Sequence, residues 1–217
     1  MQTKTIPHSM PIPKVSQLRD RLALAFAGEA GRTQLLVYLL LLVCTAAFLA
    51  HLPALSARAR FLDDEQYVGK NPLVNAPSWR SARRFFAEVS RPSTVRGYYQ
   101  PLTMTSLMID RFLGGPQGSI RAYHRTSLWL HVANTALVGV FLYRLFGQPL
   151  VAAGVALLFG LHPISVESVC WISERKTVLA TFFAMWSLIA YIRFSRHGRM
   201  RDYLVCLVMY VLALLSK

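Results

Sequence analysis

Acidic side chains stand together shortly after the first long apolar run of the chain. Asp63 and Asp64 are followed directly by Glu65, which makes three consecutive acids. A carboxylate held at a membrane–water boundary could act as a general base or as a metal ligand. The simpler interpretation is a solvated turn or a helix N-terminus, where acidic side chains are favoured by the helix dipole.

A second group of ionisable side chains lies between two later apolar runs. It contains His162, Glu167, Glu174, Arg175 and Lys176. A histidine with acidic neighbours could bind a divalent metal, whose identity the sequence leaves open. The adjacent cations at a helix start could instead hold a lipid phosphate. The ordinary alternative is that both cations extend to the membrane surface.

Two polar residues, His131 and Asn134, are one helical turn apart inside an apolar run. Polar groups inside a bilayer usually have a partner or a functional role. The favoured interpretation is a pair of interhelical hydrogen bonds.

The composition predicts an all-α integral membrane protein. Of the 217 residues 54% are hydrophobic and only 16% are charged, whereas a soluble domain has about a quarter charged residues. The net charge is +14, but the basic residues lie between the apolar runs, where they face headgroups and set topology. Nucleic acid is therefore not an expected partner. The three cysteines are scattered and indicate neither a disulfide framework nor a metal site.

Five apolar runs predict membrane spans at about 34–52, 126–144, 149–166, 177–193 and 203–217. The third is short and could be re-entrant, and the fifth is cut off by the chain end. Residues 1–33 form a basic leader, predicted to be disordered with a short amphipathic helix at 18–26, and residues 34–217 form a partial transmembrane domain. The long polar leader favours a signal anchor over a cleaved signal peptide.

Basic residues in the leader and in the 193–201 loop predict that both lie in the cytoplasm. The 53–123 loop then lies outside. Within it, Trp79, Ala82, Phe86 and Val89 have helical spacing opposite three arginines, which predicts an amphipathic helix on the bilayer surface. A second loop helix is predicted to begin near Pro101 and to stop at Gly114.

Several short motifs occur in a characteristic order: Asp63-Asp64, Asn71-Pro72, Trp79, Pro101-Leu102-Thr103, His124, His131 to Asn134, HPISVESVCW at 162–171 and SERKTVLATF at 173–182. Their order and spacing over residues 60 to 217 resemble the transmembrane-and-tetratricopeptide-repeat O-mannosyltransferase family, especially its bacterial relatives. Two positions depart from the family pattern, since Ser165 replaces a second histidine and Gln100 replaces a histidine or arginine. The sequence contains no repeat near 34 residues.

The resemblance implies a GT-C-type helical bundle that transfers a sugar from a polyprenyl-phosphate donor to an acceptor hydroxyl of a protein or glycan. The expected location is the extracytoplasmic side of a bacterial inner membrane. By analogy Asp63 would accept the acceptor proton and Asp64 would orient or assist, although the sequence does not decide which is the base. Arg175 and Lys176 would stabilise the departing phosphate.

The supporting residues implied by the resemblance are His124, His162, Glu167 and Glu174. Two other classes stay open: a non-catalytic membrane scaffold or anchor of a tetratricopeptide-repeat protein, and a transporter fragment. Five spans with an incomplete last one would not close a donor cavity, so the isolated chain is expected to be inactive or unstable.

Overall fold

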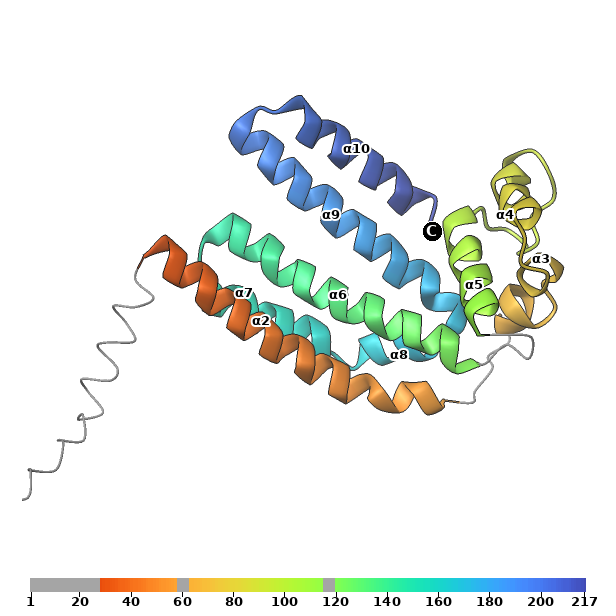
Figure 1. Ribbon diagram of the computed structural model, residues 1–217, viewed down its shortest axis with the longest axis horizontal. Helices are drawn as coiled ribbons and strands as arrows, with labels where there is room; N and C mark the ends of the chain where they lie inside the picture. Colours follow the sequence, from red (N-terminus) through yellow and green to blue (C-terminus); the bar gives the residue numbers. More distant parts are fainter. Residues whose placement is uncertain (1–27, 58–62, 115–119) are drawn as a thin grey trace, which may run out of the picture.

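The computed structural model describes residues 28–57, 63–114 and 120–217 (Figure 1). The predicted amphipathic helix at 18–26 lies outside the described residues. Throughout the described ranges the secondary structure is helical and no strand occurs, which confirms the all-α class. The long helices are α2 (Glu29–His51), α6 (Ile120–Phe146), α7 (Pro149–Leu161), α9 (Arg175–His197) and α10 (Met200–Leu214).

Among the described residues, three segments are long and apolar enough to cross a membrane: Glu29–Ser56, Ile120–Phe146 and Ile172–His197. A fourth crossing is formed if α7 and α8 (Ile164–Cys170) count as one span, although they are bent by 60° at His162 and Pro163. The bend arises because Pro163 disfavours helical backbone at the residue before it, His162, which is extended and separates the two helices. The chain is thus a helical membrane protein.

Small residues allow α2, α6 and α7 to approach closely. A Cβ added at Gly139 of α6 would overlap the Leu40 side chain of α2. A Cβ added at Gly160 of α7 would lie 2.8 Å from Thr135 Cγ2 and 3.3 Å from Ala47 Cβ. Helices inside a membrane gain stability from such close packing, because lipid tails offer no hydrophobic driving force for association.

Two hydrogen bonds link α6 to its neighbours within the bundle. His131 Nε2 lies 3.0 Å from the Gly160 carbonyl oxygen of α7, and Asn134 Nδ2 donates to the Val178 carbonyl oxygen of α9 at 2.8 Å. His131 also contacts His51 of α2, with the ring centroids 4.8 Å apart. The interhelical interpretation of His131 and Asn134 is therefore confirmed.

A cap of short helices covers one end of the bundle (Figure 1). It contains a π-helical turn (Glu65–Gly69), α3 (Pro72–Asn75), α4 (Trp79–Phe86) and α5 (Pro101–Leu113). The predicted helix from Pro101 to Gly114 is confirmed, with Gly114 as its C-cap. The cap and the bundle share a core, in which Tyr67, Val74, Phe85, Met104 and Leu107 of the cap pack with Tyr123 of α6 and with Ile172.

Helix α4 leaves most of the predicted apolar stripe exposed and packs against the cap through another residue. Ala82 and Phe85 are buried against the cap core, whereas Trp79 is 79% exposed and Phe86 and Val89 are also exposed. Helix α4 packs on α5 through Phe85, which does not belong to the predicted stripe, and through Ala82, which is the one stripe residue that is buried. The apolar residues on the outer face are thus available to the membrane surface.

Candidate functional site

The acidic turn of the cap meets the segment that leads into α9. The Asp64 side chain is fully buried, and its Oδ1 accepts a hydrogen bond from the Ser173 backbone N–H at 2.9 Å. Asp63 is exposed, and its backbone oxygen accepts hydrogen bonds that start the following π-helical turn. The loop after α2 and the α8–α9 connection, far apart in sequence, therefore lie together at one end of the bundle.

Lys176 lies on the first turn of α9, on the same side as this contact. Its ammonium nitrogen is 5.5 Å from the centroid of the Tyr67 ring and 5.2 Å from that of Tyr98. Glu174 Oε1 is 3.2 Å from the same nitrogen. The Lys176 side chain is 12% exposed, so an anionic group could reach it from outside. Two aromatic faces and one carboxylate hold a cation at this point.

Residues of the cap hold the aromatic ring that faces Lys176. The Tyr67 hydroxyl accepts a hydrogen bond from Gln100 Nε2 at 2.7 Å, and both residues are buried. Gln100 is one of the two positions that depart from the family pattern. Here it fixes the ring of Tyr67, and the sequence alone does not indicate that contact.

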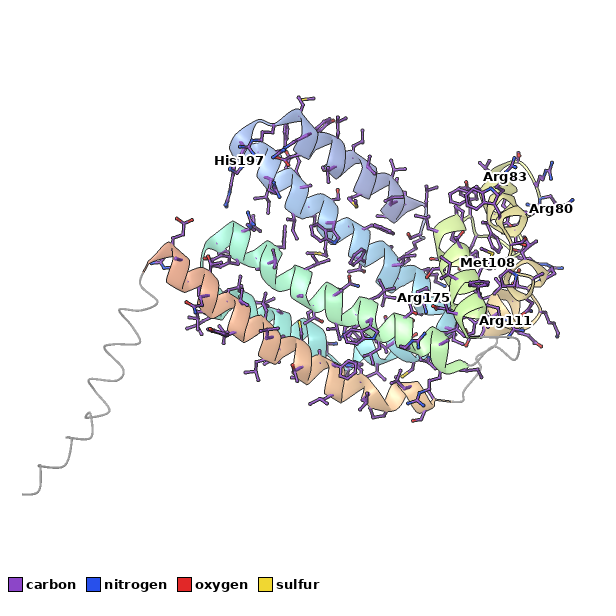
Figure 2. All side chains as sticks on the ribbon, viewed as in Figure 1. Arg80, Arg83, Met108, Arg111, Arg175 and His197 are labelled. Carbon is purple, nitrogen blue, oxygen red and sulfur yellow. The ribbon has the colours of Figure 1, made fainter. Side chains whose placement is uncertain are left out.

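Arg175 joins the cap to two helices of the bundle (Figure 2). Its guanidinium is fully buried and forms an ion pair with Asp110 Oδ2 of α5 at 2.7 Å. It also donates to Ser127 Oγ at 3.1 Å, Ser106 Oγ at 2.8 Å and the Tyr123 backbone oxygen at 2.6 Å. Asp110 Oδ1 in turn accepts from Thr126 Oγ1 at 2.6 Å. We call Arg175, Asp110, Ser106, Ser127 and Thr126 the arginine network.

The remaining predicted site residues lie in two different settings. His124 is completely buried on α6, with Nδ1 3.4 Å from the Val169 backbone oxygen. His162 and Glu167 are exposed on the bent α7–α8 segment, where His162 Nδ1 accepts from the Ile164 N–H of its own turn. In the part of the chain that the structure describes, no three His, Cys, Asp or Glu side chains lie close enough to hold a metal ion. The described residues thus do not fit a metal site.

The architecture defines a class before any relative is considered: a helical membrane protein with carboxylates and a lysine gathered where a cap of short helices meets the bundle. No family model and no solved structure matches the chain. Its amino-acid sequence is, however, similar to three curated animal proteins named as protein O-mannosyl-transferases. It is 26% identical over 171 residues to protein O-mannosyl-transferase F38B6.6 of Caenorhabditis elegans and 30% identical over 155 residues to TMTC2 of Homo sapiens. Identity to Tmtc1 of Drosophila melanogaster is 27% over 183 residues.

These matches cover 76%, 70% and 79% of this chain, which itself spans only 24%, 18% and 20% of the respective relatives. The chain is therefore a distant homologue of proteins named O-mannosyl-transferases, as the order of its motifs predicts. The relatives are animal proteins, and the expected bacterial source stays a prediction.

Proposed function

We propose that this chain forms part of a GT-C-type membrane glycosyltransferase that uses a polyprenyl-phosphate sugar donor and an acceptor hydroxyl on the extracytoplasmic side. One observation carries the proposal: the acidic turn is bonded to the segment that bears Lys176. A base and a phosphate-binding cation are the two groups that such a transfer needs. The names of the distant homologues support a protein hydroxyl as the acceptor.

In the proposed reaction the acceptor oxygen attacks the anomeric carbon of the donor sugar. The bond between that carbon and the phosphate oxygen breaks, and the electron pair leaves with the polyprenyl phosphate. The acceptor proton passes to a carboxylate. Of the two aspartates, Asp63 is exposed and therefore open to an acceptor, whereas the buried Asp64 fixes the turn through the Ser173 N–H. We assign the base to Asp63 and the positioning role to Asp64.

The phosphate is assigned to Lys176 rather than to both cations. Arg175 is fully buried and donates four hydrogen bonds to protein groups. It lies next to Lys176 in the chain, so the arginine network holds the start of α9 in place against the cap. In this proposal Arg175 positions Lys176, and Lys176 stabilises charge on the leaving phosphate.

Because the isolated chain is expected to be inactive, the proposal is tested with TMTC2 of Homo sapiens in which this chain replaces the segment it matches. The chimaera is assayed in nanodiscs with a radiolabelled mannosyl-phosphoryl-polyprenol and an acceptor peptide that contains serine and threonine. We expect transfer to the peptide, and Asp63→Asn to lower the rate at least about 100-fold, as for a lost general base. Lys176→Gln is expected to lower it by about 100- to 1,000-fold, as for a lost group that stabilises transition-state charge.

Glu65→Gln is the matched control, because Glu65 is an exposed acid in the same turn that pairs with Lys70 at 2.8 Å. Its rate is expected to equal the unmodified rate. Absence of transfer by the chimaera with this chain unmodified, or transfer by Asp63→Asn at the rate of Glu65→Gln, would contradict the proposed function.

A further inference from the structure

A cleft opens at the end of the bundle opposite the cap, between the N-terminal half of α2 and the C-terminal end of α6. Its volume is about 930 Å³, within the size range of small-molecule sites. The basic residues at its mouth are Arg32, Arg144 and Arg196. None of these residues belongs to the site proposed for sugar transfer.

The cleft has two chemically different parts. Three arginines line its mouth against one acidic residue, Glu29. The inner wall is apolar and is made by residues of α2 and α6, namely Leu36, Val37, Leu40 and Val140. Tyr143 lies where the two parts meet, and its hydroxyl is 3.3 Å from Thr33 Oγ1. A cationic mouth above an apolar wall is complementary to a molecule with an anionic head and a hydrocarbon chain.

The depth of the cleft agrees with the depth of one membrane leaflet. Arg32 and Leu40 are eight residues apart in sequence, which is about 12 Å along an α-helix. One leaflet has about 15 Å of hydrocarbon. A headgroup phosphate beside Arg32 would thus place its acyl chain along the apolar wall, at the depth where lipid tails lie. A soluble anion would leave that wall unused.

Two of the three arginines at the mouth of the cleft lie at the C-terminal ends of helices. Arg144 and Arg196 lie in the last turns of α6 and α9, and Arg196 Nη2 donates to the Arg144 backbone oxygen. That contact caps the C-terminal end of α6 and holds one guanidinium over the cleft. The nearby Arg193 is already paired with Asp202 at 3.6 Å. Guanidinium groups bind phosphate oxygens in pairs, which favours phosphate over other anions.

From this geometry we propose that the cleft between α2 and α6 binds one anionic phospholipid, with its phosphate on Arg32, Arg144 and Arg196 and an acyl chain along Leu36, Val37, Leu40 and Val140. Basic pockets between transmembrane helices are known to bind anionic headgroups. The site is independent of the proposed sugar transfer, because it lies at the other end of the bundle.

The test uses the full chain in detergent and native mass spectrometry with palmitoyl-oleoyl phosphatidylglycerol or the matching phosphatidylcholine. We expect one phosphatidylglycerol per chain, bound at least about tenfold more tightly than phosphatidylcholine, since each arginine near a headgroup contributes a factor of about five. Arg32→Gln with Arg144→Gln leaves Arg196 alone at the mouth and should reduce the preference to about fivefold or less. Arg32→Gln alone should reduce it about fivefold.

Arg80→Gln with Arg83→Gln is the matched control, because both arginines lie on α4 in the cap, far from His197 at the cleft end (Figure 2). That variant should keep the full preference. Val140→Trp, which fills the apolar wall, should weaken phosphatidylglycerol binding at least about tenfold while size-exclusion elution stays unchanged. Glycerophosphoglycerol, the headgroup without its chains, should not bind.

Equal binding of the two phospholipids would overturn the proposal. It would also be overturned if the cleft variants and the α4 control lost the preference for phosphatidylglycerol to the same extent. Binding of glycerophosphoglycerol as tight as that of the whole lipid would overturn it as well. Displacement of phosphatidylglycerol by a peptide of residues 1–27 would agree with a lipid site in the cleft. Occupation of the cleft by residues 1–27 with no lipid bound would contradict the proposal.

Discussion

The arginine network offers the sharpest test of how the cap is held on the bundle. Arg175 has no exposed side-chain surface, and Asp110 has only 4%. Removal of one partner from a buried ion pair leaves an uncompensated charge, which costs about 3–5 kcal/mol. We therefore expect Asp110→Leu and Arg175→Met each to lower the free energy of unfolding by about that amount.

The double variant separates this explanation from a simple loss of packing. Replacement of a buried ion pair by apolar residues of similar volume is often close to neutral, although Ser106 and Ser127 would lose a donor here. We expect Asp110→Leu/Arg175→Met to cost no more than either single variant, which corresponds to a coupling energy of about 3 kcal/mol or more.

The assay is denaturant unfolding of the purified chain in mixed micelles, followed by far-ultraviolet circular dichroism. Lys70→Met and Glu65→Leu form the control pair, since their side chains are 78% and 59% exposed and such pairs contribute about 0–1 kcal/mol. The arginine network does not hold the cap if the Asp110 and Arg175 substitutions lower the free energy of unfolding additively. The same conclusion follows if they lower it no more than the Lys70 and Glu65 substitutions do.

Three further predictions concern the packing of the bundle and cap. Gly139→Ala is expected to destabilise the chain by about 1–3 kcal/mol because the new Cβ overlaps Leu40; Gly154→Ala, which meets no atom within 4 Å, should be neutral in the same unfolding assay. Asn134→Leu should cost about 0.6–1.7 kcal/mol through the lost bond to Val178, and an unchanged unfolding midpoint would argue against that bond. Phe85→Ala should lower the free energy of unfolding by about 3–5 kcal/mol, whereas Trp79→Ala should change it by no more than about 0.5 kcal/mol in detergent; the reverse order would mean that Trp79, and not Phe85, packs against the cap.

The sequence predicts the parts of this fold that follow from periodicity and local signals. Apolar runs identify the helices, and Pro101 with Gly114 marks both ends of α5. The hydrogen bonds of His131 and Asn134 were predictable in kind because polar groups inside an apolar helix need partners. Which backbone carbonyls they reach, those of Gly160 and Val178, depends on the packing of α7 and α9.

The contacts of the candidate site were predictable only in part. The motif order indicates that Asp64 and Lys176 belong to one site, but not that the Ser173 backbone N–H links them. Asp110 is the only acidic residue of the apolar helix α5, which indicates that its carboxylate has a partner but not which residue that partner is. Arg175, 65 residues further along the chain, becomes that partner only when the cap folds onto α6 and α9. The 3.6-residue period identifies the residues that share one face of a helix, whereas tertiary packing determines which residues contact that face.

The most direct measurement of the central claim is photocrosslinking with a diazirine-bearing mannosyl-phosphoryl-polyprenol, followed by mapping of the labelled peptides. The proposed site predicts label on residues 63–67 of the acidic turn and on 174–176 at the start of α9, and loss of that label in Lys176→Gln but not in Lys70→Gln. Label confined to the cleft between α2 and α6, or unaffected by Lys176→Gln, would contradict the assignment of the donor site to the cap end of the bundle.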